Sequence, residues 1–324
     1  FKCRIPTGSA LARPAAPPET STSSTSGRQS LDSRSWRFYK HGDEQGLTTG
    51  ARVNAVERLG QRGTEWVESL GDFVRFVMAI NGWILRGPGR FARKQTWVQM
   101  YEIGTLSIPV VMITGAFIGA VLAIETFPQF QQIGLESRIG SVINISVVKQ
   151  IGPVLTAVML AGRVGGALTA ELGTMKVTEQ IDAMRAMAAD PVRALAVPRF
   201  VACIVMMPIL TIFSDLLGMF GGWFMSVQVL GVDAHQYWEF TQQNMDLYTI
   251  NTGFLKSLFF GSAIASIACY KGFHSGAGAQ GVGRACTDGF VSSFVTILVM
   301  NFFIAMAMNA IYTIVWPGGG SFFG

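Results

Sequence analysis

Charged residues, histidines and the usual catalytic motifs are scarce in this sequence. Only 14% of its 324 residues are charged and three are histidine, whereas ordinary soluble domains carry roughly 25% charged residues. The sequence contains no HExxH, GxSxG or GxxxxGK[ST] motif, which mark zinc hydrolases, serine hydrolases and P-loop nucleotide binding. It therefore predicts no catalytic residue, no metal site and no cofactor held by this chain.

Cysteine is equally sparse. The four cysteines, Cys3, Cys203, Cys269 and Cys286, form no CxxC pair, which argues against a disulfide framework and a zinc site. One GxGxxG match occurs at residues 276–281, but it follows a long apolar segment instead of a strand. We therefore interpret it as a tight loop and not as a dinucleotide site.

Apolar residues are abundant and gathered into long runs. They make up 50% of the chain, and the mean hydropathy is +0.38. No charge occurs for 21 residues from Gly104 to Ile124, or for 36 residues from Gly289 to Gly324, and about 20 apolar residues suffice to span a bilayer. We expect an all-α polytopic membrane protein with five spans. Their predicted ranges are 102–126, 141–169, 200–230, 251–271 and 289–316.

Several ionisable residues fall in or beside the predicted spans. A charge at membrane depth usually faces protein or a cavity, so these residues are candidates for contact with a lipid headgroup. The candidates are Lys149, Arg163, Glu171 and Asp215. The alternative is structural: Arg163 and Glu171 lie about two helical turns apart and could simply brace the start of the following loop.

The loops between the spans differ in charge. Loops 170–199 and 272–288, counted with Lys271, hold six Lys or Arg, whereas loops 127–140 and 231–250 hold only Arg138. Lys and Arg accumulate on the cytoplasmic face or its organellar equivalent. We therefore expect the N-terminus and the first pair of loops to face the stroma, the matrix or the cytosol.

The first 95 residues are basic, with 15 Lys or Arg against 8 Asp or Glu. Residues 1–45 are predicted to be a disordered, Ser-rich head with the composition of an organellar transit peptide; the alternative is a disordered tail without an address. Residues 46–97 are predicted to be a basic juxtamembrane segment. Within it, residues 64–85 place apolar side chains at helical spacing with charges between them, so we expect a helix in the membrane interface. The alternative is an amphipathic helix packed on a soluble domain.

A short amphipathic segment interrupts the polar insertion within residues 161–199. Thr178 is the predicted N-cap of a helix that ends at Met187. Ile181, Met184 and Ala188 are predicted to lie near one face. Such a helix is either a docking point for a soluble partner or a plain connection between two spans. Composition does not separate these two alternatives.

Several motifs occur together in this half of the chain. They are GPVLTA at 152–157, AGRVG at 161–165, AELGTM at 170–175, VTEQIDA at 177–183 and GVGRA at 281–285. In this combination the chain resembles the MlaE-type ABC permease family over about residues 65–318, and most of all its plastid lipid-import members. The run GTMKVTEQIDA is long and specific, so chance is a poor explanation for the resemblance.

The resemblance implies an assembly. Members of this family act as homodimers, and each protomer has an interfacial elbow helix and a permease domain of five spans, here residues 98–318 with a tail at 319–324. Soluble ABC ATPase subunits, which carry ATP and Mg²⁺, dock on a coupling helix, and MCE-domain lipid-binding subunits sit on the opposite face. The residues that the resemblance assigns to ATPase coupling are Glu179, Gln180, Ile181, Asp182, Met184, Arg185 and Met187.

The resemblance also implies a cargo and a location. The cargo is a glycerolipid, a phosphatidic acid-like precursor, that crosses the plastid inner envelope; a bacterial inner membrane is the alternative location. No nucleic-acid partner is expected. Two other function classes remain open: an ATPase-independent secondary lipid transporter or channel, which inverted repeats would favour, and an intramembrane enzyme. The enzyme needs a nucleophile with a base or paired carboxylates, and Asp215 stands alone.

Overall fold

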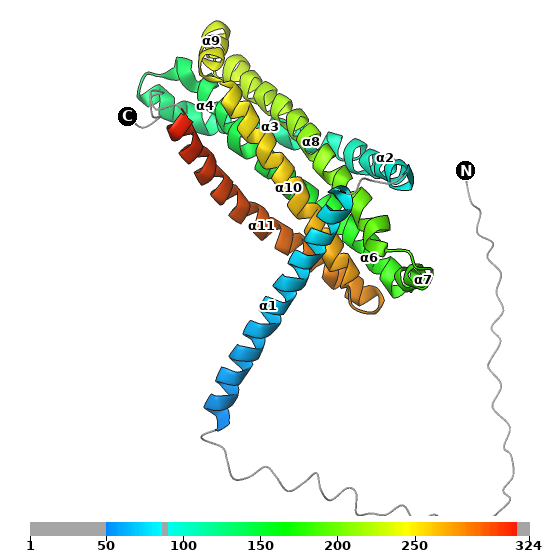
Figure 1. The fold of residues 1–324 in the computed structure, drawn as a ribbon. Helices are drawn as coiled ribbons and strands as arrows, with labels where there is room; N and C mark the ends of the chain where they lie inside the picture. The colour runs from blue at the N-terminus through cyan, green and yellow to red at the C-terminus, as the bar shows by residue number, and fades with distance from the viewer. Residues whose placement is uncertain (1–49, 86–89, 316–324) are drawn as a thin grey trace, which may run out of the picture. The chain divides into compact units, whose positions relative to one another are not determined.

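The computed structural model describes residues 50–85 and 90–315, and within these ranges the regular structure is entirely helical (Figure 1). The chain divides into two units, Phe1–Glu65 and Trp66–Gly324. Of the first unit only residues 50–65 are described, and they form the start of α1 (Gly50–Leu85). The predicted head at residues 1–45 and the predicted tail at 319–324 lie outside the described residues.

Five helical segments of the second unit are long and apolar enough to span a membrane, which confirms the predicted all-α polytopic class. Each segment begins earlier along the chain than the sequence predicted. Hydropathy detects the apolar centre of a helix, whereas backbone hydrogen bonding continues into the polar turns at its ends. The segments are Lys94–Gln132, Glu136–Val177, Val192–Val229, Leu247–Phe273 and Gly278–Ile314.

Several spans combine more than one helical element. The first joins α2 (Arg90–Thr105) to α3 (Ile108–Gln132), and the second and third contain π-helical turns. The other α-helices are α4 (Ile139–Ser146), α5 (Gly152–Leu160), α6 (Gly166–Val177), α7 (Gln180–Ala186), α8 (Val197–Trp223), α9 (Ala234–Asn244), α10 (Leu247–Phe273) and α11 (Gly278–Val315). The π-helical turns are Val147–Ile151, Ala161–Gly165, Val192–Ala196 and Phe224–Val229, and Glu136–Arg138 is a 3₁₀ turn.

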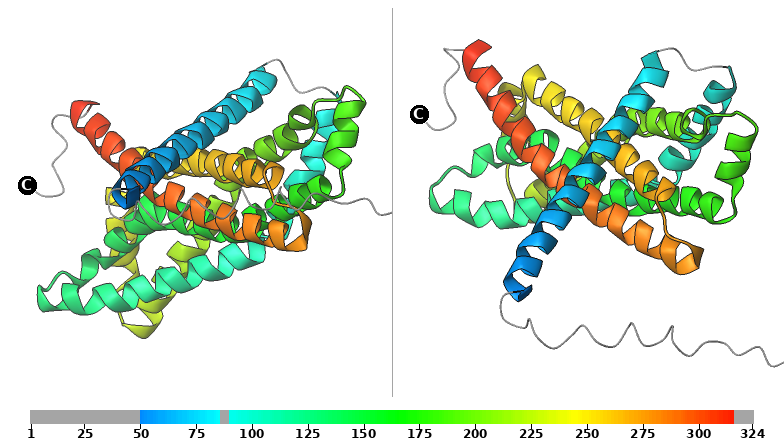
Figure 2. Two further views of the ribbon diagram at one scale, coloured as in Figure 1. Left: turned by 90° about the horizontal axis from the view of Figure 1, so that it is seen from below. Right: turned by 60° about the horizontal axis from the view of Figure 1, so that its bottom comes forward.

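Helices α8 and α10 form the centre of the second unit. α8 packs along α3 and also contacts α2 and α10, while α10 packs against α6 and α11. The helices α7 and α9 lie at opposite ends of this pair, and the turn from α10 to α11 lies at the α7 end (Figures 1 and 2). The two loops with most Lys and Arg are therefore at one end of the bundle, as the predicted orientation requires; the orientation itself stays a prediction.

Glycines allow α3 and α8 to approach each other closely. A Cβ added to Gly119 would lie 1.8 Å from the carbonyl oxygen of Gly218, and one added to Gly115 would lie 2.5 Å from that of Ser214. Small residues at a spacing of four bring membrane helices together in this way. By contrast, a Cβ on Gly166 would meet nothing within 4 Å. The close contact of Gly115 and Gly119 on α3 is therefore made with α8 of the same chain.

The second half of α1 has one packed and one exposed face. The rings of Phe73 and Phe76 lie 5.4 and 5.9 Å from that of Tyr270 on α10, measured between centroids, and Ile80 is fully buried. Four apolar side chains at helical spacing stay exposed on α1: Val67, Leu70, Val74 and Met78. Such a face suits a helix in the membrane interface, although that location stays a prediction.

Candidate functional site

The predicted short helix is present as α7, but Thr178 is not its N-cap. The Thr178 hydroxyl donates to the carbonyl of Thr174 at 2.9 Å, at the end of α6. Helix α7 begins at Gln180, after Glu179 turns the chain with a φ of 59°. The prediction was wrong because a threonine hydroxyl can equally bond the carbonyl four residues earlier, within the helix that it follows.

Helix α7 is anchored by one face and exposes the other. Ile181 is 2% exposed, and Met184 packs against the same core cluster. On the free face, Asp182 and Arg185 form a 3.0 Å ion pair, and both side chains are more than half exposed. The other predicted coupling residues are exposed as well: Glu179, Gln180 and Met187. A short helix with a fixed apolar face and a free polar face offers a binding surface to a soluble partner.

The connection from α7 to α8 is attached to the end of α1. The indole Nε1 of Trp83 donates to Oδ2 of Asp190 at 3.0 Å, and the guanidinium of Arg193 lies 4.7 Å from the centroid of the Trp83 ring. The other oxygen of Asp190 accepts from the backbone N–H of Val192 at 2.9 Å. These contacts hold the end of α1 to the connection between α7 and α8. No sequence pattern pairs residues 83 and 190, so sequence reasoning missed them.

Glu171 and Arg163 each have a separate partner. Oε2 of Glu171 accepts from Nη2 of Arg199 at 2.8 Å, and Arg199 is only 4% exposed. Arg163 donates to the carbonyl of Leu106, at the break between α2 and α3. The first contact joins α6 to the start of α8. Both contacts connect separate helical segments, as the structural alternative predicted. A headgroup role for these two residues stays a prediction.

Lys149 lies in a π-helical turn that a second lysine supports. Its ammonium is 5.9 Å from the centroid of the Tyr248 ring. Lys256 of α10 is 1% exposed and donates to the Lys149 carbonyl at 3.1 Å and to the side chain of Gln150. Pro153 has no N–H to donate to the Lys149 carbonyl, which lies four residues earlier. The Lys256 ammonium supplies a donor instead. Lys256 was not among the predicted candidates, although a lysine inside a predicted span was a signal for it.

Asp215 of α8 faces the same part of the second span. Its Oδ1 lies 1.7 Å from where a Cβ on Gly152 would be, and this buried oxygen has no hydrogen-bond partner among the described residues. Only glycine fits at residue 152 without moving the carboxylate. Two of the four predicted candidates therefore lie at one part of the second span: Lys149 belongs to it, and Asp215 faces it at Gly152. Arg163 and Glu171 contact other residues instead.

The GxGxxG segment begins in the short turn between α10 and α11 and continues into the first turn of α11. Gly278 has a φ of 73°, and a Cβ on Gly281 would lie 2.4 Å from the backbone of Gly276. No strand occurs in residues 50–85 or 90–315. Only Gly276 and Ala277 lie in the loop, and residues 278–281 form the first turn of α11. The loop interpretation therefore holds for the start of the motif alone.

At the other end of the bundle, buried hydrogen bonds attach α9 to α4. Asn144 donates to the Thr241 hydroxyl at 3.1 Å and accepts from the Tyr237 hydroxyl at 3.3 Å. Burial raises the pKa of Tyr237 to about 12. Helix α9 is thus a fixed feature of the face opposite α7.

Comparison with known proteins decides the family. The profile of the family described as Permease MlaE matches residues 96–307. The chain belongs to the MlaE permease family. A "Probable ABC transporter permease protein" of Rickettsia bellii is 38% identical over 252 residues, which are 78% of this chain and 96% of that protein.

Two further MlaE-family relatives have more specific names. The "Intermembrane phospholipid transport system permease protein MlaE" of Haemophilus influenzae is 32% identical over 259 residues, 79% of this chain and 98% of that protein. "Protein TRIGALACTOSYLDIACYLGLYCEROL 1, chloroplastic" of Arabidopsis thaliana is 32% identical over 217 residues, 67% of this chain and 62% of that protein. The predicted resemblance to the MlaE family is confirmed, and the chloroplast protein is among the relatives. The names favour a transport subunit over an enzyme.

Proposed function

We propose that this MlaE-family chain is the membrane subunit of an ABC-type lipid transporter. It would work as a homodimer in the plastid inner envelope and move a phosphatidic acid-like glycerolipid. The name of the Haemophilus relative supports phospholipid as the cargo class, and the name of the Arabidopsis relative supports the chloroplast. The basic, Ser-rich residues 1–45 support the same location independently.

The energy source in this proposal is a separate ATPase subunit that carries ATP and Mg²⁺ and docks on α7. The observation that carries the proposal is the exposed polar face of α7, held by the buried Ile181 within a family of ABC permeases. An MCE-domain lipid-binding subunit is proposed to bind at the opposite end, where α9 lies.

The contacts around α7 suggest how a push on this helix reaches the spans. Helix α7 follows α6 directly, and the Glu171–Arg199 pair ties α6 to α8. The Trp83–Asp190 hydrogen bond ties the connection between α7 and α8 to α1. A displacement of α7 would therefore move the second span, the third span and the elbow together. Packed elements of this kind shift as units.

A charge swap on α7 tests the docking proposal. Asp182→Arg with Arg185→Glu reverses both exposed charges but keeps the pair at a spacing of three, so α7 should still fold. We expect the ATPase to bind at least about tenfold more weakly, because like charges facing each other across an interface cost several kcal/mol. Co-purification of the ATPase and ATP-driven lipid transfer into acceptor vesicles are the measurements.

A matched swap on α1 serves as the control. Asp72→Arg with Arg75→Glu reverses an exposed pair of the same spacing, 3.9 Å apart, away from α7. This control should bind the ATPase and transfer lipid as the unmodified chain does. Normal ATPase binding by the α7 variant would refute the docking assignment. Full-speed transfer by the chain without any ATPase would instead favour a secondary transporter.

A further inference from the structure

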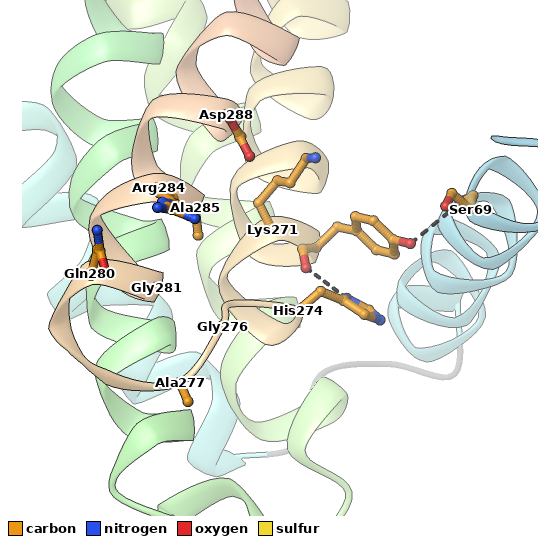
Figure 3. Close-up of a pocket in the computed structure, with 11 residues that line it drawn as sticks. Ser69, Lys271, His274, Gly276, Ala277, Gln280, Gly281, Arg284, Ala285 and Asp288 are labelled. Carbon is orange, nitrogen blue, oxygen red and sulfur yellow. Dashed lines mark hydrogen bonds between the residues drawn. The ribbon is translucent and has the colours of Figure 1, made fainter. Parts of the chain in front are cut away.

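A polar pocket of about 580 Å³ lies where α10 ends and α11 begins, and the coupling proposal does not use it (Figure 3). Its lining comes from three helices and the residue that caps one of them: Ser69 on α1, Lys271 on α10, His274 at the C-cap of α10, and Arg284 and Asp288 on α11. The charge-free part of α11 starts directly afterwards, at Gly289. A pocket at this boundary lies at the depth of lipid headgroups if the helices span as proposed.

The pocket contains two cations, Lys271 and Arg284. Within the described ranges, neither Lys271 nor Arg284 forms a salt bridge. The lining holds one carboxylate, Asp288, so two cations and one acid leave a net charge of +1 when His274 is neutral. Lys and Arg that lack a carboxylate partner are the usual ligands of phosphate groups.

The pocket walls are held in place by hydrogen bonds to the backbone. Nδ1 of His274 lies 2.9 Å from the carbonyl of Tyr270, which orients the imidazole ring. The Tyr270 hydroxyl donates to the carbonyl of Ser69 at 3.4 Å and so connects α10 to α1 (Figure 3). Lys176 of α6 donates to the carbonyl of Ser275 at 2.8 Å, in the turn between α10 and α11. These hydrogen bonds connect residues of α1, α6 and α10 around the pocket.

An apolar stripe on α11 continues from the pocket along the membrane-spanning part of the helix. Residues 284 and 288 line the pocket, and steps of three and four residues lead from them to four exposed apolar side chains on the same side of the helix. These are Val291, Val295, Leu298 and Phe302, with exposed fractions of 51%, 52%, 46% and 64%. A cationic pocket that opens onto an apolar stripe matches a ligand with a charged head and a hydrocarbon chain.

We propose that this pocket binds the phosphate of a phospholipid in the leaflet on the α7 side, with an acyl chain along the α11 stripe. This goes beyond the transport proposal, because the site can hold cargo or a resident lipid and needs no ATPase. A soluble phosphate would satisfy the same cations but would make no use of the stripe. A second copy of the chain covering the stripe would leave the two cations without a ligand.

Native mass spectrometry of the purified full chain tests the site. The chain is placed in nanodiscs of uncharged galactolipid with a small fraction of phosphatidic acid, and retained lipid is counted. We expect Lys271→Gln with Arg284→Gln to reduce phosphatidic acid retention at least tenfold. Lys271→Arg with Arg284→Lys keeps the charges and should keep retention, which separates charge from misfolding. Unchanged retention in the neutral variant would overturn the proposal.

A control of equal charge change is available on α1 and α2. Arg75→Gln with Lys94→Gln removes two exposed cations that lie outside this pocket, and phosphatidic acid retention should not change. An equal loss in this control would show unspecific attraction and overturn the site. Diacylglycerol with the same acyl chains should not be retained. Inorganic phosphate that binds as tightly as phosphatidic acid would overturn the lipid assignment.

A photoactivatable acyl chain tests the stripe. Phosphatidic acid with a diazirine in one chain should label peptides that contain residues 291–302, and the Lys271→Gln, Arg284→Gln variant should lose this labelling. Equal labelling of α3, which also exposes apolar side chains such as Phe117, would contradict a defined path. The α7 charge swap should leave both results unchanged, so the site and the transport proposal can fail separately.

Discussion

Lys256 shows how single residues keep polar atoms paired inside this bundle. Its side chain is almost fully buried, yet its ammonium reaches the Lys149 carbonyl and Gln150, both on the neighbouring span. The partner carbonyl is one that Pro153 cannot satisfy, because proline has no N–H. A buried polar group without a partner is costly, so the lysine has a structural reason to lie in an apolar helix.

Replacing Lys256 with Met removes the ammonium and keeps an apolar stem. The Lys149 carbonyl then loses a donor, which costs about 1–3 kcal/mol; part of this is offset because a buried charge is also removed. We expect a net loss of about 1 kcal/mol, seen as a lower Tm in detergent. Lys94→Met, at an exposed position, should leave Tm unchanged. A higher Tm for the Lys256 variant would show that desolvation of the lysine outweighs its hydrogen bonds.

At the scale of elements, the closest approach of one helix backbone to a glycine of another, among the described residues, joins α3 and α8. Gly119 and Gly218 meet through their backbones, and Gly221 approaches Ala116 in the same way, with an added Cβ only 2.1 Å from its carbonyl oxygen. Helices this close gain dispersion contacts along their whole length. The first and third spans should therefore move as one body.

Gly119→Ala tests this contact. The new Cβ would lie 1.8 Å from the Gly218 carbonyl oxygen, so the helices must separate, and overpacking of this kind costs about 1–3 kcal/mol. Gly166→Ala is the matched control, because its Cβ meets nothing within 4 Å and alanine is the better helix former by roughly 1 kcal/mol. Thermal unfolding in detergent should show a lower Tm for the first variant and an equal or higher Tm for the second. The reverse order would refute the packing argument.

At the scale of the whole molecule, the charge of the loops and the geometry of the bundle agree. Helix α7 and the α10–α11 turn lie at one end, and α9 lies at the other (Figure 1). The first end carries most of the loop Lys and Arg, which favours the stromal or cytosolic face. This places the proposed ATPase surface and the proposed phospholipid pocket on the same side of the membrane.

Cysteine labelling from one side of the membrane tests this orientation. In a chain with Cys3→Ser and Cys286→Ser, the remaining Cys203 and Cys269 are buried and should not react. We expect a membrane-impermeant maleimide to label Arg185→Cys on α7 only from the stromal or cytosolic side, and Gln242→Cys on α9 only from the other side. Labelling of both positions from one side of sealed vesicles would contradict five spans or the placement of α9.

Sequence alone was enough to predict five spans, the family and the short helix between the second and third spans. Each of these depends on residues close together in the chain: a hydrophobic run, a motif such as GTMKVTEQIDA, or a polar interruption. Even the error at Thr178 was local, since one hydroxyl had two acceptors within reach and the sequence did not say which it uses.

Three-dimensional packing set the pairing of the polar groups. Lys256 and Lys149, like Trp83 and Asp190, are 107 residues apart in the chain, and the pocket combines side chains from α1, α10 and α11. Periodicity shows which face of a helix is apolar, but it does not show which other helix that face meets. Because a hydrogen bond needs its two atoms within about 3 Å, such partners are defined only once the helices are packed together.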